Sequence, residues 1–178
     1  MGKIIEYTLV SADGVFAETD LSAFMAFRDD AYLRDGLGLL LACDAMLIGR
    51  RSYENMAGMW PGRAHPWAER LNAMPKYVFS STLETAEWNN STIVSGDVGA
   101  EASKLKDEIE GNLLIWGHTL LAQTLLDRRL IDVLDLSIHP LIVGHGKLLH
   151  QQGQSANLKL VATKAFANIV KLTYEPQY

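Results

Sequence analysis

The chain has 178 residues, 48% hydrophobic and 21% charged, an ordinary balance for one globular domain with a substantial core. Its net charge of -5 argues against a nucleic-acid-binding protein, and its single cysteine, Cys43, excludes an internal disulfide and fits the cytoplasm. The N-terminus lacks a signal-peptide layout, and the longest apolar stretch, Leu37 to Met46, is too short to cross a bilayer. We therefore expect a single cytoplasmic domain over residues 1–178, without a membrane partner.

Patterns typical of strands and helices alternate along the chain. A first strand is predicted over Lys3–Val10, followed by a long helix over Leu21–Ala42, where Phe24 and Phe27 recur at helical spacing. The next elements, in order, are a strand at Ala45–Ile48, helices at Ser52–Met59 and Pro66–Ala73, strands at Lys76–Ser80 and Thr92–Val94, a helix at Ala100–Glu110, a strand at Asn112–Trp116, a helix at Leu120–Asp127, and strands at Val133–Pro140, Leu158–Phe166 and Ile169–Tyr174.

This alternation predicts an α/β fold with a mainly parallel sheet covered on both faces, because several strands are apolar throughout. The last two strands follow one another without a helix, so the sheet is expected to be mixed, with an antiparallel edge. Ligands of such open sheets bind beyond the carboxyl ends of the strands. The chemistry is therefore expected in the loops that follow Val10, Ile48, Phe79 and Ile115.

The junction Gly49-Arg50-Arg51-Ser52 carries the strongest functional signal. A buried strand that ends at Gly49 and opens onto a helix leaves free backbone N–H groups, where a phosphate can bind. Arg50 and Arg51 add positive charge and planar donors that suit phosphate oxygens. The alternative is a plain strand-to-helix turn with solvated arginines and Ser52 as the helix cap. The coincidence of three features favours a phosphorylated cofactor.

Two further junctions could take part in the same site. Ser80 and Ser81 follow a strand, and their hydroxyls could bind phosphate or simply shape a turn. Gly117 allows a ligand to approach the backbone closely, and a helix that begins near Thr119 presents N–H groups. A tight turn capped by Thr119 is the alternative.

Acidic residues near the first loop are candidates for proton transfer. Asp20 and Asp30 flank the aromatic face of the long helix, and a carboxylate that faces an apolar cleft can donate a proton. Both could instead be caps or solvated surface residues, and Asp20 fits an N-cap. The pair Asp13-Gly14 is typical of an ordinary turn.

Several other chemistries lack their motifs. His139, His145 and His150 surround a glycine-containing loop without the spacing of a zinc site, so no metal is expected. The sequence has no G-x-G-x-x-G, no G-x-x-x-x-G-K-[ST] and no G-x-S-x-G. Their absence disfavours an ordinary Rossmann site, a P-loop and an α/β-hydrolase.

The chain resembles the dihydrofolate reductase-like superfamily in seven blocks: Ser11–Val15, Asp44–Glu54, Trp60-Pro61, Lys76–Ser81, Ile115–Leu120, Leu130–Asp132 and His139–Leu149. It is most similar to the reductase domain of bifunctional riboflavin-biosynthesis deaminase-reductases and its stand-alone bacterial relatives. The resemblance implies a three-layer α/β/α fold around a mixed, mostly parallel sheet of about eight strands. The zinc motifs of the deaminase half do not occur in this chain.

The resemblance also implies a function. It suggests an NADPH-dependent reductase that transfers hydride to a small heterocyclic substrate, of the 5-amino-6-(5-phosphoribosylamino)uracil reductase type in riboflavin biosynthesis. The implied cofactor contacts are Ala12, Gly14, Gly49, Arg50, Arg51, Ser52, Ser80, Ser81, Gly117, His118, Thr119 and Leu120. Asp20 and Asp30 compete for the role of the catalytic acid, and related domains pair as homodimers.

Three other functions stay open at this point. A true dihydrofolate reductase would act on folates, and a non-catalytic, dimeric NADPH-binding protein would bind the cofactor without turnover. A plain α/β domain without a cofactor would leave Arg50 and Arg51 as surface charges.

Overall fold

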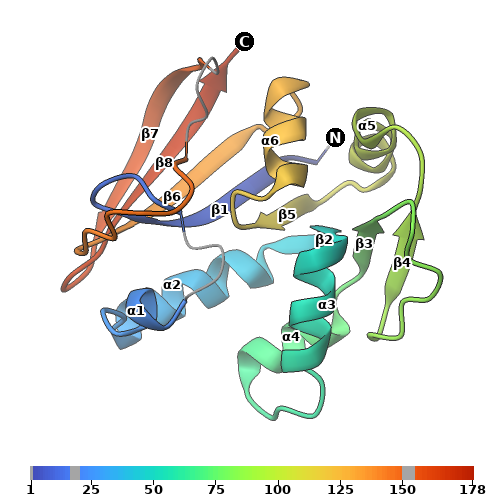
Figure 1. Cartoon of the computed structure of the whole chain (residues 1–178), viewed down its shortest axis with the longest axis horizontal. Helices are drawn as coiled ribbons and strands as arrows, with labels where there is room; N and C mark the ends of the chain where they lie inside the picture. Colours follow the sequence, from blue (N-terminus) through green and yellow to red (C-terminus); the bar gives the residue numbers. More distant parts are fainter. Residues whose placement is uncertain (1, 17–20, 150–154) are drawn as a thin grey trace.

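The computed structural model describes residues 2–16, 21–149 and 155–178 (Figure 1). The strands are β1 (Ile4–Ser11), β2 (Cys43–Gly49), β3 (Lys76–Phe79), β4 (Ser91–Val94), β5 (Asn112–Trp116), β6 (Val133–His139), β7 (Asn157–Ala165) and β8 (Val170–Gln177). The helices are α1 (Ser22–Met25), α2 (Asp30–Leu41), α3 (Arg50–Met59), α4 (Pro66–Ala73), α5 (Val98–Glu108) and α6 (Leu120–Asp127).

The eight strands form one sheet in the order β4-β3-β2-β5-β1-β6-β8-β7. The six strands from β4 to β6 pair in parallel, whereas β8 pairs antiparallel with both β6 and β7. The predicted mixed sheet with an antiparallel C-terminal edge is therefore confirmed. Because β7 and β8 form a hairpin, they need no crossover helix and can follow one another directly in the sequence.

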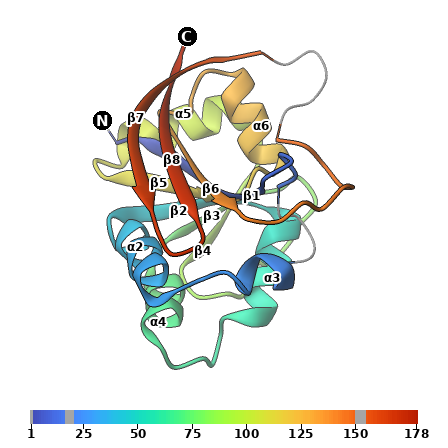
Figure 2. The same cartoon turned by 90° about the vertical axis from the view of Figure 1, so that its left-hand side faces the viewer.

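The sheet is covered on both faces, as the apolar strands predict (Figures 1 and 2). Helices α2, α3 and α4 pack on one face, and α5 and α6 pack on the other. Alternate residues of β1 serve the two layers: Ile5 and Leu9 belong to the core beneath α2, and Ile4 and Val10 belong to the core beneath α6. The three-layer α/β/α fold is confirmed.

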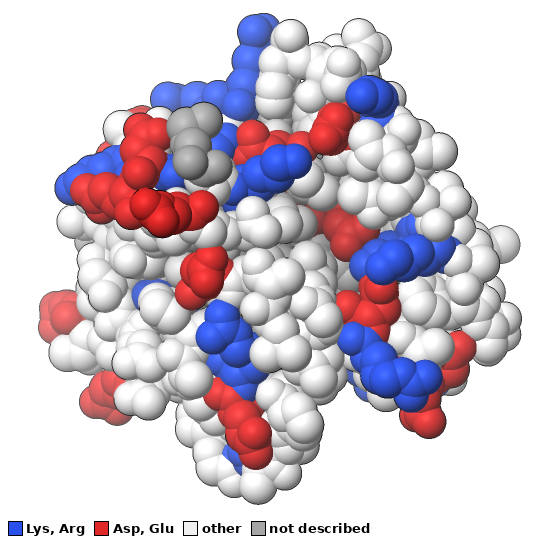
Figure 3. Space-filling model, turned by 180° about the vertical axis from the view of Figure 1, so that it is seen from behind, with Lys and Arg blue, Asp and Glu red and all other residues white. Residues whose placement is uncertain are grey.

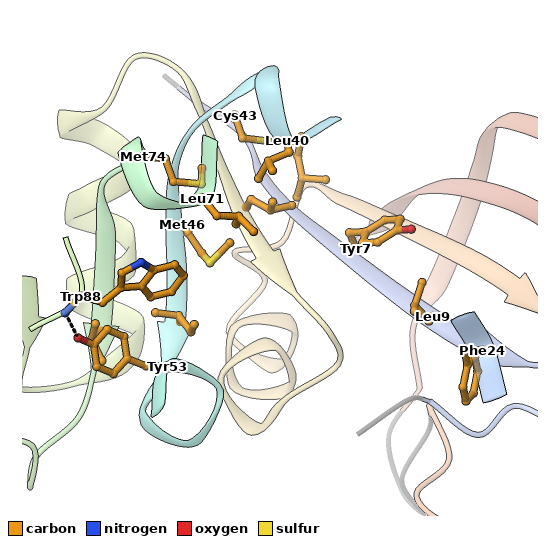
Figure 4. Close-up of a cluster of buried hydrophobic side chains, with 14 of the residues drawn as sticks. Tyr7, Leu9, Phe24, Leu40, Cys43, Met46, Tyr53, Leu71, Met74 and Trp88 are labelled. Carbon is orange, nitrogen blue, oxygen red and sulfur yellow. Dashed lines mark hydrogen bonds between the residues drawn. The ribbon is translucent and has the colours of Figure 1, made fainter. Parts of the chain in front are cut away.

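The core beneath α2 is assembled from helices and strands that are distant in sequence (Figure 4). Leu40 of α2, Met46 of β2 and Leu71 of α4 are almost completely buried there. At its outer end, the hydroxyl of Tyr53 on α3 accepts a hydrogen bond from the backbone N–H of Trp88 at 2.9 Å. This bond fixes α3 to the loop between β3 and β4.

The prediction of one continuous helix over Leu21–Ala42 is wrong. Helix α1 ends at Met25, and α2 begins after Asp29, whose side chain accepts from the backbone N–H of Tyr32 at 2.7 Å. The other carboxylate oxygen of Asp29 accepts from the N–H of Ala167, in the turn between β7 and β8, at 2.9 Å. A contact with so distant a residue fixes the helix start, which apolar spacing cannot reveal.

Acidic and basic side chains are interspersed over the back of the molecule (Figure 3). Exposed ion pairs such as Arg128 with Asp97, at 3.2 Å, contribute at most about 1 kcal/mol to stability. The hairpin is held differently, because the half-buried Asp35 of α2 pairs with Lys164 of β7 and with the buried Lys171 of β8. No helix in the described ranges is long and apolar enough to cross a membrane.

Candidate functional site

The four loops that the sequence singles out lie along one edge of the sheet. Strands β3, β2, β5 and β1 are consecutive neighbours and run parallel, so their carboxyl ends meet at the same edge. In order along this edge stand Ser80, Gly49, Gly117 and Ala12. An elongated ligand could contact all four loops at once.

The start of α3 is open to an anion. Gly49 is the N-cap residue of α3 and has no side chain to cap it, so the first N–H groups of the helix keep their donor capacity. The guanidinium of Arg50 donates to the Thr82 hydroxyl at 2.6 Å and to the Glu54 carboxylate at 2.8 Å. Arg51 is exposed beside it, and Ser52 is half-buried. The loops that follow β2 and β3 are thus brought together around Arg50.

The loop after β3 is shaped by its first serine. The hydroxyl oxygen of Ser80 accepts from the backbone N–H groups of Thr82, at 3.2 Å, and Leu83, at 3.0 Å. Ser81 is exposed next to it. Ser80 therefore forms the turn that the sequence offered as an alternative, and this turn presents the Thr82 hydroxyl to Arg50.

The start of α6 is also open. Gly117 has a φ of +88°, which favours glycine, and its N–H donates to the carbonyl of Tyr7 at 2.7 Å. Thr119 is the N-cap residue of α6 but makes no capping hydrogen bond with its side chain, and Leu120 is 78% exposed. The two open helix starts are close, since a Cβ at Gly49 would lie 3.9 Å from the Cβ of Leu121.

The described helices differ in whether a side chain caps their N-terminus. Helices α2 and α5 start with aspartates, Asp29 and Asp97, whose carboxylates accept from first-turn N–H groups. A side-chain cap satisfies donors that a helix start otherwise leaves free. Within the described part of the chain, α1, α3, α4 and α6 lack such a cap, and of these α3 and α6 directly follow the carboxyl ends of β2 and β5, at the sheet edge where ligands bind. This arrangement fits a phosphate or pyrophosphate group.

The side chain of His118 is 2% exposed and lies within the protein. Its Nδ1 is 2.6 Å from Oε1 of the fully buried Glu6, which also accepts from the Thr8 hydroxyl at 3.0 Å. His118 was predicted as a cofactor contact, whereas Glu6 was not predicted at the site. The available signal for Glu6 was a glutamate within the apolar run of β1. In this arrangement only the backbone of His118 could face a ligand at the sheet edge.

Hydroxyl groups meet on the α2 side of β1. The hydroxyl oxygens of Tyr7 and Tyr32 are 2.5 Å apart, and the Ser137 hydroxyl donates to that of Tyr7 at 3.4 Å. Burial raises the pKa of both tyrosines, so both hydroxyls stay protonated near neutral pH. Sequence analysis missed these three residues, because each also fits an ordinary core position.

Of the two predicted catalytic acids, Asp30 is the one that the structure describes. Asp30 is exposed on the first turn of α2, and Asp20 lies outside the described residues. His139, at the end of β6, is buried, and burial lowers its pKa, so its ring is neutral near pH 7. The described residues contain no cluster of side chains that could hold a metal ion.

Comparison with known proteins assigns this architecture to a family. The sequence profile of the RibD C-terminal domain matches residues 3–172. The chain belongs to the RibD C-terminal domain family. It is also 30% identical over 138 residues to the uncharacterized protein YyaP of Bacillus subtilis, covering 74% of this chain and 73% of YyaP.

Several solved structures have a fold similar to that of this chain. A putative riboflavin biosynthesis protein from Shewanella sp. PV-4 has a TM-score of 0.78 and 18% identity, with 99% of each chain covered. A deaminase/5-amino-6-(5-phosphoribosylamino)uracil reductase from Thermotoga maritima has a TM-score of 0.69 and 14% identity, and 99% of this chain covers 57% of that protein. Dihydrofolate reductase from Enterococcus faecalis, complexed with NADP(H), has a TM-score of 0.60 and 16% identity, with 99% and 98% covered. The dihydrofolate reductase-like fold is confirmed.

Proposed function

We propose that this protein is an NADPH-dependent reductase of a small heterocyclic substrate, of the 5-amino-6-(5-phosphoribosylamino)uracil reductase type. The observation that carries the proposal is the meeting of two uncapped helix starts, those of α3 and α6, beside Arg50 and Arg51. Membership of the RibD C-terminal domain family supports a reductase. The Thermotoga relative is described as a 5-amino-6-(5-phosphoribosylamino)uracil reductase, and we propose the same class of substrate for this chain.

Each segment of the edge has a separate part in binding. Arg50 and Arg51 would hold the 2′-phosphate of NADPH, because guanidinium groups match phosphate oxygens in shape and charge. The first N–H groups of α3 and α6 would hold the pyrophosphate. Gly117 lets the backbone come close to it, since a glycine adds no side chain at the turn. The turn containing Ala12 and Gly14, after β1, would border the nicotinamide.

NADPH, when bound, supplies the hydride. The protein orients the two reactants and excludes water from the reacting atoms. The α2 side of β1 would receive the substrate, because Tyr7 pairs in register with Trp116, which directly precedes the Gly117 turn. The Tyr7, Tyr32 and Ser137 hydroxyls on that side are neutral, buried and bonded to one another, so a heterocycle would hydrogen-bond them by replacing one of these bonds.

The state of the acidic residues on α2 separates this proposal from a dihydrofolate reductase. Asp29 caps the helix, Asp30 is exposed, and Asp35 is paired with Lys164 and Lys171. The buried residues of α2 are Tyr32, Gly36 and Leu40, and the polar side chain among them is the neutral hydroxyl of Tyr32. A neutral hydroxyl favours a neutral ring over a protonated pterin.

Titration of the purified protein with NADPH and NADH tests the proposal, with Trp116, half-buried at the edge, as one fluorescent reporter. We expect tight binding of NADPH and much weaker binding of NADH. Turnover with dihydrofolate would instead establish the folate enzyme, and binding without turnover on pterins or pyrimidines would establish a cofactor-binding protein. Failure to bind either nucleotide would overturn the reductase. The predicted homodimer stays a prediction, which light scattering would check.

A further inference from the structure

Asp13 holds two separate segments of the chain together. One of its carboxylate oxygens accepts from the Ser11 hydroxyl at 2.5 Å and from the backbone N–H of Val143 at 3.2 Å. The other accepts from the backbone N–H of Gly144 at 2.8 Å. The turn after β1 is thereby joined to the segment that follows β6, more than a hundred residues away (Figure 1).

Backbone hydrogen bonds continue this junction on either side of the carboxylate. The N–H of Ala12 donates to the carbonyl of Leu141 at 2.9 Å, and the N–H of Leu149 donates to the carbonyl of Gly14 at 2.9 Å. The N–H of Phe16 donates to the carbonyl of Lys147 at 3.1 Å. Residues 11–16 and 141–149 therefore form one hydrogen-bonded unit, which we name the Asp13 clasp.

The clasp depends on a negative charge. The Ser11 hydroxyl, with the backbone amides of Gly144 and Val143, lowers the pKa of Asp13 to about 2, so the carboxylate stays ionised at all ordinary pH values. Gly144 has a φ of +73°, which turns successive backbone N–H groups toward an anion. The sequence pair Asp13-Gly14 indicated an ordinary turn, and nothing in that pattern signals the second segment.

The clasp stands where the reacting end of the proposed cofactor would lie. Ala12 and Gly14 follow the carboxyl end of β1, and the Gly117 turn is bonded to the same strand through the carbonyl of Tyr7. The second segment carries Ile142, whose side chain is 80% exposed. A flat apolar ring could be covered by such a residue only if the segment is held in place.

We propose that Asp13 is a positioning residue for the nicotinamide half of the cofactor. Its carboxylate fixes the Ala12–Gly14 turn against residues 141–149, so that this wall of the site is formed before the ligand binds. The proposal rests on the proposed function. It assigns the two halves of the cofactor to different parts of the site. The Arg50 end of the sheet edge recognises the adenosine phosphate, and the Asp13 clasp recognises the nicotinamide half.

Two ligands separate these ends. NADP+ contains both halves, whereas adenosine 2′,5′-bisphosphate lacks the nicotinamide. In calorimetric titrations, Asp13→Ala should weaken NADP+ binding about tenfold, as expected for loss of hydrogen bonds to a charged group. Binding of adenosine 2′,5′-bisphosphate should be unchanged. Asp13→Asn keeps one acceptor oxygen, so its affinity for NADP+ should lie between those of Asp13→Ala and the unmodified protein.

Asp97→Asn is the matched control, because Asp97 also accepts from a backbone N–H, that of Ala100 at 2.9 Å, but at the start of α5. It should change neither affinity. Faster amide hydrogen exchange at Gly144 in Asp13→Asn would show directly that the clasp has opened.

Four results would overturn the proposal. Equal losses for both ligands in the Asp13 variants would mean a general loss of structure, and unchanged NADP+ binding with faster exchange at Gly144 would mean that the clasp has no part in binding. The unmodified protein could also bind adenosine 2′,5′-bisphosphate as tightly as NADP+. The proposed role of the Asp13 clasp would then be wrong, whereas the proposed phosphate site would be supported. If the unmodified protein bound neither ligand, the proposed function itself would fail, and the role of the clasp with it.

Discussion

The guanidinium of Arg50 donates to the hydroxyl of Thr82 at 2.6 Å, which joins the first turn of α3 to the loop after β3. Thr82 is itself held by the Ser80 hydroxyl, which accepts from its backbone N–H. Arg50 is exposed, and this bond, together with the one to the Glu54 carboxylate at 2.8 Å, restricts the rotamers that its long side chain would otherwise sample. The bond orients the arginine toward the edge where the two uncapped helices begin.

Removing the hydroxyl of Thr82 should therefore weaken recognition of the 2′-phosphate. We expect Thr82→Val to lower the affinity for NADPH by about two- to fivefold, the effect of one modest hydrogen bond, and to leave NADH binding unchanged. Calorimetric titration measures both. Thr85→Val, at an exposed position in the same loop, is the control. Equal effects of the two variants would argue against an orienting role for Thr82.

The buried pair of Glu6 and His118 should matter for stability. His118→Ala would leave the carboxylate of Glu6 buried without its imidazole partner, which typically costs about 3–5 kcal/mol in the free energy of unfolding. The double variant Glu6→Leu with His118→Phe should recover much of this loss, because neither member of the pair is then buried without its partner. Urea denaturation measures each value. A loss below about 1 kcal/mol in His118→Ala would contradict this account.

Two glycines of α2 should respond to alanine in opposite directions. A Cβ at Gly36 would lie 2.8 Å from the ring of Trp67, which is itself packed against Trp116 at 5.5 Å between ring centroids. Gly36→Ala should therefore destabilise the protein by about 1–3 kcal/mol through overpacking. A Cβ at Gly38 meets nothing within 4 Å, so Gly38→Ala should stabilise it by about 0.5–1 kcal/mol. Thermal or urea unfolding checks the pair, and a shared sign would contradict the packing account.

Lys76 should make stability depend on pH. Its ammonium group is buried, donating to the carbonyls of Met74 at 2.7 Å and Asn89 at 2.8 Å, and burial lowers its pKa from 10.5 to about 8. Between these values the unfolded chain binds more protons than the folded one, so the free energy of unfolding should rise with pH from about 8 to 10, by up to about 1.4 kcal/mol per pH unit.

The control for this prediction is Lys76→Met, which removes the titrating group while keeping an unbranched side chain. Urea denaturation of both proteins at pH 7, 8, 9 and 10 gives the difference in their unfolding free energies. This difference should change in favour of the unmodified protein above pH 8. A difference that stays constant with pH would show that Lys76 keeps an ordinary pKa.

Patterns within single segments predicted most of the fold. The bounds of α4 and α6 agree with Pro66–Ala73 and Leu120–Asp127, because a proline at the first helical position and local apolar spacing specify them. The site was harder to predict, since it depends on contacts between segments. Glu6 stands out within an apolar run, but no local pattern pairs it with His118 or pairs Asp13 with its distant partners. The break before α2 likewise follows from a bond between Asp29 and the distant Ala167.

The central claim is that the sheet edge recognises the 2′-phosphate of NADPH, and the most direct measurement is a comparison of NADPH and NADH affinities in matched arginine variants. Arg50→Ala and Arg51→Ala should each reduce the preference for NADPH at least tenfold, as expected for losing a charge-assisted bond to phosphate. Arg128→Ala, which removes an exposed arginine paired with Asp97, should leave the preference intact. Equal affinities for NADPH and NADH in the unmodified protein, or a preference that survives Arg50→Ala and Arg51→Ala together, would contradict the account.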